Sequence, residues 1–234
     1  VVPGNTGVIL STGLAASFTQ SSGDPNRSTQ TSTDTTGTNN NAQFNSLAGS
    51  STYDAAILDV DFIPQGNFLT MKFVFGSEEF PEYSSSQYND VFGVWVNGTL
   101  VPFGVGNDKV SVNNLTSPDA GNLFRNNTND AYNTEMDGFT ITLSLNIPVI
   151  AGVVNSIRIG IADVQDARYD SNLLIAGNSG QSTLVAIRDR EQMFIGQTKT
   201  FDVLDNDVNI NGGGLTITHI NGIPITAGQT ITLP

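Results

Sequence analysis

The sequence predicts an all-β protein whose main body is an antiparallel β-sandwich of two sheets, jelly-roll-like in type. Only 13% of the 234 residues are charged, and the polar positions are filled mainly by Ser, Thr, Asn and Gln beside 24 Gly. This mixture favours strands and turns over helices. Apolar residues alternate with polar ones in several segments, and none has a convincing 3.6-residue period.

The first half of the chain contains most of the clear strand patterns. The run GVILSTG (7–13) is short, apolar and bounded by Gly, which predicts one strand. Alternating apolar residues predict further strands at 56–62 and 69–75, and an apolar run predicts another at 91–96. Asn97-Gly98 is a strong two-residue hairpin signal, because both turn positions need a positive φ. The return strand is expected at 99–103.

The second half of the main body repeats these patterns after a turn-rich stretch at 104–138. Apolar alternation predicts one strand from Phe139 to Ile147, another over 157–161 and a third over 173–176. Residues 28–41, by contrast, contain no apolar side chain. We expect 19–41 to be the most mobile part of the main domain, cut first by trypsin at Arg27, unless a partner or ion holds it.

Two domains are expected, over residues 1–178 and 184–234, joined by a linker around 177–183 (GNSGQST). The second has short strands predicted at 198–204, 215–220 and 230–233. Fifty residues are too few for a complete immunoglobulin-like sandwich, which usually takes about 100. The second module is therefore predicted to be incomplete.

The charge balance excludes some classes of partner. A net charge of −13 argues against nucleic acid and anionic membrane surfaces, and it agrees with divalent cations. The chain has no Cys, so neither disulfides nor a thiolate metal site can form. No run approaches the ~18 apolar residues of a membrane span, so no transmembrane segment is predicted in this chain.

The segment FGSEEFPEYSSSQYNDVFGVWVNG (75–98) brings acidic residues into an apolar framework. It holds Glu78, Glu79, Glu82 and Asp90 and not one Lys or Arg. Three explanations are open: a metal ion, a catalytic carboxylate pair, or a loop solvated by water. Asp163 and Asp170 flank a second acidic loop, and sandwich loops gather at the ends of the sheets, so the two loops could meet.

Calcium is the first explanation, because Ca²⁺ takes six to eight oxygen ligands from carboxylates, Asn side chains, carbonyls and water. Asp54 and Asp137 are weaker candidates, since each precedes a strand, where Asp often caps a turn. A second, weaker set in the tail is Asp202, Asp205 and Asp207. The main predicted ligand set is Glu78, Glu79, Asn89, Asp90, Asp163 and Asp170.

Enzymatic and sugar-binding sites are the alternatives to calcium. Glu79 with Asp90 would be a glycosidase pair, whereas the adjacent Glu78 and Glu79 would point to opposite faces of a strand. His219 is the only His, and this count excludes a zinc site of the usual His/Cys type. A Ser-His-Asp triad would have to use His219, which lies on a predicted strand of the tail. Trp95, Tyr83 and Tyr88 could form a carbohydrate-binding face, or else fill and cover the core.

Six spaced motifs resemble one known family. In order they are GVILSTG (7–13), YDAAILDVDFIP (53–64), FVFGSEEFPEY (73–83), NDVFGVWV (89–96), DGFTITL (137–143) and IRIGIADVQDARYDSNLLI (157–175). Together they resemble the choice-of-anchor L domain of secreted and surface-attached bacterial proteins, over roughly residues 7–177. The tail, with VLDND and LTIT, resembles the start of the cadherin-like or immunoglobulin-like repeats of bacterial adhesins.

These resemblances imply a non-catalytic, structural or adhesive domain that is secreted or displayed on a bacterial cell surface. Expected partners are other copies of the chain, neighbouring surface proteins or surface glycans. The alternative is a carbohydrate-binding module of a secreted protein. The chain is also expected to be a segment of a larger protein, or a subunit whose edge strands at 7–11 or 230–233 pair with a neighbour.

Overall fold

The computed structural model describes residues 2–19, 30–103, 110–115, 123–187, 189, 192, 194–200, 202–220, 223–226 and 229. The chain divides into two compact units, Val1–Ser182 and Thr183–Pro234, which are described separately. The expected strand at 230–233 and the expected cleavage site at Arg27 lie outside the described residues.

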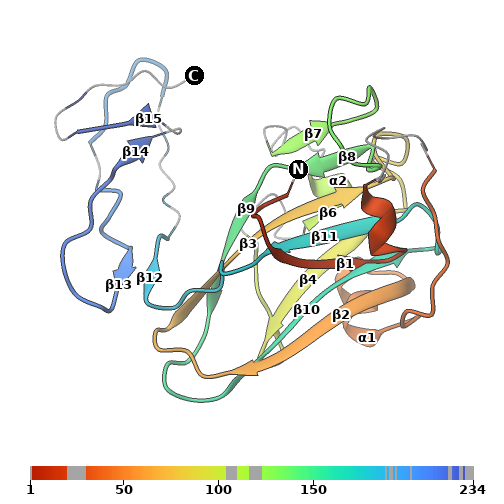
Figure 1. Ribbon diagram of the computed structural model, residues 1–234, viewed down its shortest axis with the longest axis horizontal. Helices are drawn as coiled ribbons and strands as arrows, with labels where there is room; N and C mark the ends of the chain where they lie inside the picture. The colour runs from red at the N-terminus through yellow and green to blue at the C-terminus, as the bar shows by residue number, and fades with distance from the viewer. Residues whose placement is uncertain are drawn as a thin grey trace. The chain divides into compact units, whose positions relative to one another are not determined.

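The first unit is an antiparallel sandwich, which confirms the predicted fold class (Figure 1). One sheet has the order β1-β11-β3-β8-β7, with β9 also paired to β3. These strands are β1 (Gly7–Ser11), β3 (Phe68–Ser77), β7 (Phe124–Asn126), β8 (Gly138–Thr140), β9 (Leu143–Pro148) and β11 (Ser171–Ala176). In the described part of the chain, β1 pairs with β11 alone, so it is an edge strand, as expected.

The second sheet has the order β2-β10-β4-β5, with β6 also paired to β4. Its strands are β2 (Thr52–Phe62), β4 (Val91–Val96), β5 (Thr99–Leu100), β6 (Val110–Ser111) and β10 (Asn155–Val164). Asn97 and Gly98 have φ of 49° and 81°, as the predicted hairpin requires. The return strand β5 is shorter than the predicted 99–103.

The core lies between the two sheets and is made by the alternating residues that the sequence singles out. Phe73 and Phe75 of β3 face Phe92 of β4, and the rings of Phe73 and Phe92 lie 4.9 Å apart between centroids. Every second residue of β10 from Ile157 to Ile161 joins the same cluster. The period of two in these strands therefore predicts their inner faces correctly.

The predicted single strand from Phe139 to Ile147 is wrong in one respect. It forms two strands, and the register of their pairing with β3 shifts by one residue between β9 and β8. A one-residue shift turns side chains to the opposite face. Phe139 therefore packs in a separate cluster with Phe18 and Met136, whereas Leu143 and Leu145 face the main core.

The sequence pattern also missed the short helix α1 (Ala42–Ala48), which has only two buried apolar residues, Phe44 and Leu47. Asn41 caps it by accepting hydrogen bonds from the N–H groups of Gln43 and Phe44, and Gly49 ends it in the left-handed conformation. A 3₁₀ helix, η1 (Ala15–Phe18), and α2 (Val112–Leu115) are shorter still.

Helix α1 covers the outer face of the five-stranded sheet. The ring of Phe44 meets the indole of Trp95 edge to face, with centroids 5.1 Å apart. Gly93 makes this possible, because a Cβ there would lie 2.3 Å from the indole of Trp95. Trp95 is 6% exposed, so the interpretation of Trp95 as a core residue is confirmed.

Within its described residues, the second unit has two pairs of two-residue strands: β12 (Leu184–Val185) with β13 (Val208–Asn209), and β14 (His219–Ile220) with β15 (Ile223–Pro224). The predicted strand at 198–204 is wrong, since its described residues form no strand, and that at 215–220 is reduced to its last two residues. The sequence pattern overestimated these strands. A short alternating run forms a stable strand only when one face packs against a core, and this packing is lacking among the described residues here.

Candidate functional site

The two acidic loops meet at one end of the sandwich, as expected. The first joins β3 to β4 and ends at Asp90, and the second joins β10 to β11. Asp90 Oδ1 accepts a hydrogen bond from the N–H of Val164 (3.0 Å), and its Oδ2 accepts one from the Ser171 hydroxyl (2.5 Å). The N–H of Glu78 donates to the carbonyl of Asp170 (3.2 Å).

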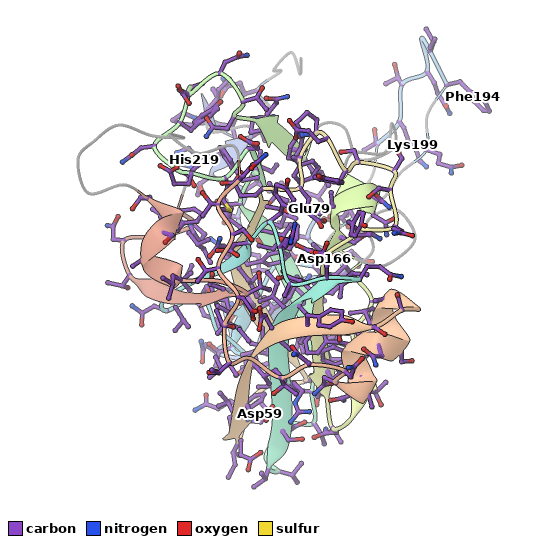
Figure 2. All side chains as sticks on the ribbon, turned by 90° about the vertical axis from the view of Figure 1, so that its right-hand side faces the viewer. Asp59, Glu79, Asp166, Phe194, Lys199 and His219 are labelled. Atoms are coloured by element: carbon purple, nitrogen blue, oxygen red, sulfur yellow. The ribbon has the colours of Figure 1, made fainter. Side chains whose placement is uncertain are left out.

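Five buried carboxylates gather where these loops meet, and we call them the central cluster. None is more than 1% exposed. Figure 2 shows Glu79 and Asp166 together, well away from Asp59 near the opposite end of the sandwich. The members of the central cluster are Asp54, Glu79, Asp90, Asp163 and Asp170.

Asp163 is the member with the fewest hydrogen bonds. Neither of its carboxylate oxygens has a partner in hydrogen-bonding geometry. Burial, followed by the charge of Asp90, holds the pKa of Asp163 well above its usual range, and the nearby Thr12 hydroxyl offsets only part of this. The pairing of β10 with β2 shifts register just before Asp163. Such bulges re-aim side chains and are common next to functional sites.

Glu79, Asp90 and Asp170 also have raised pKa values. Burial and then the charge of Asp90 raise the pKa of Glu79 to about 10. Burial raises the pKa of Asp90 to about 7 and that of Asp170 to about 6, although hydrogen bonds lower both. None of the main causes of these shifts is a Lys or Arg. Among the residues that the structure describes, the fold therefore concentrates negative charge here, and none of these shifts is attributed to a cation.

A polar segment that we call the strap, residues 30–41, closes over the cluster. The N–H of Thr33 donates to Asp170 Oδ1 (2.8 Å), and the N–H of Thr35 donates to Asp54 Oδ2 (3.1 Å). A bridge between Thr38 and Ala55 fixes its far end. The expectation that this stretch makes no contacts of its own is therefore wrong for residues 30–41, whereas its mobility stays a prediction. Backbone N–H groups bonded to buried carboxylates replace the apolar contacts that the segment lacks.

Two of the predicted ligands lie outside the central cluster. Glu78 lies near the carboxylates of Asp137 and Glu135, whose charges add to burial and raise its pKa to about 9. Asn89 Oδ1 accepts a hydrogen bond from the N–H of Asn113 (2.8 Å), so its oxygen supports a turn. Asp54, a weaker candidate by sequence, belongs to the cluster, because its charge raises the pKa of Asp170.

The acidic residues of the tail are arranged differently. Asp202 Oδ1 accepts a hydrogen bond from the N–H of Leu204 (2.9 Å), and Asp207 Oδ1 accepts one from that of Ile187 (2.7 Å). Asp202 and Asp205 are exposed, as is His219. These contacts are those of ordinary turn-capping residues.

The donor chemistry of the central cluster suits a hard cation, because it consists of carboxylate oxygens with hydroxyl and carbonyl groups nearby. Among the residues that the structure describes, no three Asp, Glu or His side chains are already placed to hold a metal ion. An ion would therefore have to draw the carboxylates together by side-chain rotation.

Three partly buried tyrosines lie beside the same loops. The rings of Tyr83 and Tyr88 have centroids 5.5 Å apart, and those of Tyr83 and Tyr169 are 5.0 Å apart. The hydroxyl of Tyr83 donates to that of Tyr169 (3.3 Å). Tyr83 and Tyr88 were expected as possible sugar contacts, and Tyr169 extends the group. Trp95 is not part of it.

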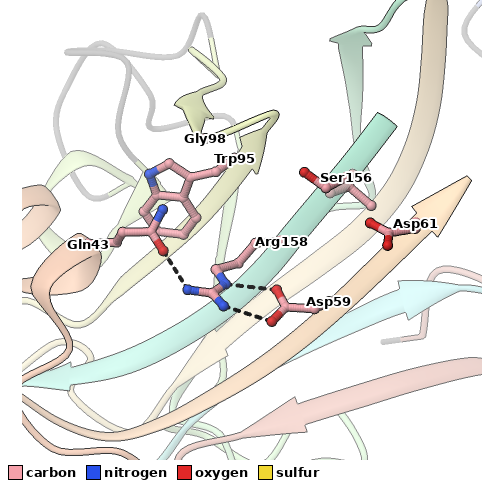
Figure 3. Close-up of a pocket in the computed structure, with 8 residues that line it drawn as sticks. Gln43, Asp59, Asp61, Trp95, Gly98, Ser156 and Arg158 are labelled. Carbon is pink, nitrogen blue, oxygen red and sulfur yellow. Dashed lines mark hydrogen bonds and ion pairs between the residues drawn. The ribbon is translucent and has the colours of Figure 1, made fainter. Parts of the chain in front are cut away.

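A separate hollow of about 350 Å³ lies over the five-stranded sheet, beside α1 (Figure 3). The guanidinium of Arg158 donates two hydrogen bonds of 2.7 Å to Asp59 and one of 2.6 Å to Gln43. These contacts tie α1 to β2 and β10, so the geometry indicates a structural role for Arg158.

Comparison with known families agrees with the spaced motifs and the sandwich. The family model for the choice-of-anchor L domain matches residues 1–181. The chain belongs to the choice-of-anchor L domain family. This match covers all but the last residue of the first unit, including both acidic loops and the strap. The resemblance of the tail to cadherin-like or immunoglobulin-like repeats stays a prediction.

Other comparisons add little for this choice-of-anchor L domain. No curated protein matches it. Among solved structures, a family 35 carbohydrate-binding module from an environmental isolate aligns with 16% identity, covering 71% of this chain and 96% of that one, with a TM-score of 0.29. A TM-score this low supports no inference about function. No described helix is long and apolar enough to cross a membrane.

Proposed function

We propose that this chain is a non-catalytic structural or adhesive domain of a secreted or surface-attached bacterial protein, and that calcium bound at the central cluster stabilises it. Membership of the choice-of-anchor L family supports the extracellular location. The observation that carries the calcium proposal is Asp163, a buried carboxylate whose two oxygens have no hydrogen-bond partner and whose neighbours are also acidic.

The physical argument starts from the cost of burying like charges. An ionised carboxylate without a partner is strongly unfavourable in a protein interior. The central cluster must therefore hold protons or a cation. Calcium is the cation of choice, because it accepts many oxygen ligands in flexible geometry, whereas Mg²⁺ requires near-ideal octahedral geometry and keeps much of its water. Glu79, Asp90 and Asp163 would be the main ligands, with Asp170 and Asp54 beside them.

Isothermal titration of the chelator-treated chain with Ca²⁺ tests this proposal directly. Asp163→Asn keeps the shape of the side chain and removes one charged ligand, so affinity is expected to fall about tenfold or more. Asp61→Asn is the matched control, because Asp61 is exposed on β2 and lies outside the central cluster. Equal affinities for wild type and Asp163→Asn would contradict a calcium site at the central cluster.

A carbohydrate-binding module is the second candidate, and the tyrosine group favours it. Partly exposed tyrosines combine an apolar face with a hydroxyl, which suits stacking against a sugar ring. If glycans bind there, a glycan array should give specific signals that Tyr83→Ala or Tyr169→Ala removes and Tyr132→Ala leaves unchanged. Signals that all three variants retain, or none with wild type, would exclude the tyrosine group as a sugar site.

A further inference from the structure

A row of three carboxylates runs across three neighbouring strands at the end of the six-stranded sheet. The paired residues of β3 end at Ser77, and continuing both registers by one residue sets Glu78 opposite Asp170 on the β11 side and opposite Asp137 on the β8 side. The hydrogen bond from the Glu78 N–H to the Asp170 carbonyl continues the ladder. Directly opposite residues of antiparallel strands share a face, with Cβ atoms about 4.5–5.5 Å apart.

This row is buried. Glu78, Asp137 and Asp170 are each at most 1% exposed, and neither carboxylate oxygen of Glu78 has a partner in hydrogen-bonding geometry. Burial, with the charges of Asp137 and Glu135, raises the pKa of Glu78 to about 9, against a lowering contribution from Thr31. An ionised carboxylate buried without a partner is strongly unfavourable, so Glu78 requires a cation or a proton.

A neutral oxygen on the same face points to a cation. Asn172 lies on β11 two residues after Asp170, and alternation along the strand brings both to one face. It is 1% exposed, its amide N–H donates to the sulfur of Met136 (3.1 Å), and its Oδ1 has no partner in hydrogen-bonding geometry. Met136 stands between Glu135 and Asp137 in the sequence. Carboxylates with an amide oxygen are a donor set typical of calcium.

We propose that Glu78 and Asp137, with Glu135 and Asn172, hold a second divalent cation, calcium by its donors. Glu78, Asp137, Glu135 and Asn172 all lie outside the central cluster, so the inference does not depend on the central site. Asp170 lies between the two groups. An ion here would join the ends of β3 and β8 to the segment that precedes β8. The carboxylate side chains would rotate toward the ion, and its charge would neutralise theirs.

Counting bound ions by equilibrium dialysis with ⁴⁵Ca²⁺ tests the second site on the full chain. Wild type is expected to bind two ions, and the double variant Glu78→Gln/Asp137→Asn one. Asp163→Asn is also expected to bind one, through loss of the central ion. Asp61→Asn, the exposed control, should retain two. Both substitutions in the double variant are nearly isosteric and remove buried charge, so the variant is expected to fold.

The outcomes separate the two sites. A double variant that binds as many ions as wild type overturns the second site, whatever Asp163→Asn does. Loss of one ion in the double variant with no change in Asp163→Asn supports the second site and contradicts the central one. Anomalous diffraction from wild-type crystals grown with a lanthanide needs no variant. A peak between Glu78 and Asp137 is expected, and its absence at millimolar ion overturns the proposal.

Discussion

Millimolar Ca²⁺ is expected to raise the melting temperature of the chelator-treated protein by about 5–10 °C. A ligand that binds only the folded state adds about 2.7 kcal/mol to the free energy of unfolding at 100 times its dissociation constant. For chains of 150–250 residues, 1 kcal/mol corresponds to roughly 2–4 °C. Ca²⁺ stabilises because it replaces the repulsion among buried carboxylates at the central cluster with ion–oxygen contacts.

Three comparisons make this measurement specific. Asp163→Asn should lose most of the calcium-dependent shift, whereas Asp61→Asn should keep it. Mg²⁺ at the same concentration should stabilise less, because it prefers a rigid octahedral shell with several waters. Identical melting curves with and without Ca²⁺ would show that the cluster is neutralised by protons instead.

The metal-free protein is expected to lose stability as the pH rises from about 5 to about 9, with the melting temperature falling by several degrees. Burial raises the pKa of Asp170 to about 6, of Asp90 to about 7, of Glu78 to about 9 and of Glu79 to about 10. A group whose pKa is higher in the folded than in the unfolded state stabilises the fold fully below its unfolded pKa. That stabilisation disappears as the pH passes the folded value.

Calcium should flatten or reverse this trend, because it binds the ionised carboxylates and competes with protons. The measurement is thermal unfolding at pH 5, 7 and 8.5 after passage over a chelating resin, with and without added Ca²⁺. Glu79→Gln should reduce the pH slope of the metal-free protein, since Glu79 faces the acidic Asp90 and Asp166. A metal-free protein that is as stable at pH 8.5 as at pH 5 would contradict this account.

Much of the sandwich can be predicted from local pattern. Alternation in β3 and β10 identified inner-facing residues such as Phe73 and Ile159, because a half-buried strand exposes every second side chain. The Asn97-Gly98 turn was predictable because few residue pairs tolerate two positive φ angles. Phe139 was misplaced, because a one-residue register shift depends on partner strands that are distant in the sequence.

The candidate site was only partly predictable. Composition identified both acidic loops and four members of the central cluster in the first ligand set, since a cation-free stretch beside apolar strands is a local signal. Strand alternation placed the adjacent Glu78 and Glu79 on opposite faces, but it did not indicate which carboxylates each of them would meet. Composition also gave no sign of the strap. Thr33 and Thr35 hold the strap in place through their backbone N–H groups, which do not depend on the type of side chain.

The sequence by itself determined the strand-forming segments, the excess of carboxylates and the family. All three depend on composition or on short motifs, and none of them requires knowing which distant segments meet. The tertiary structure alone decided which carboxylates meet. The pairings of Ser77 with Ser171 and with Gly138 bring Glu78 beside Asp170 and Asp137, which lie 92 and 59 residues further along the chain (170 − 78 and 137 − 78). Those pairings follow from burial of the strands' apolar faces, and so the packing of the core sets the position of the charges.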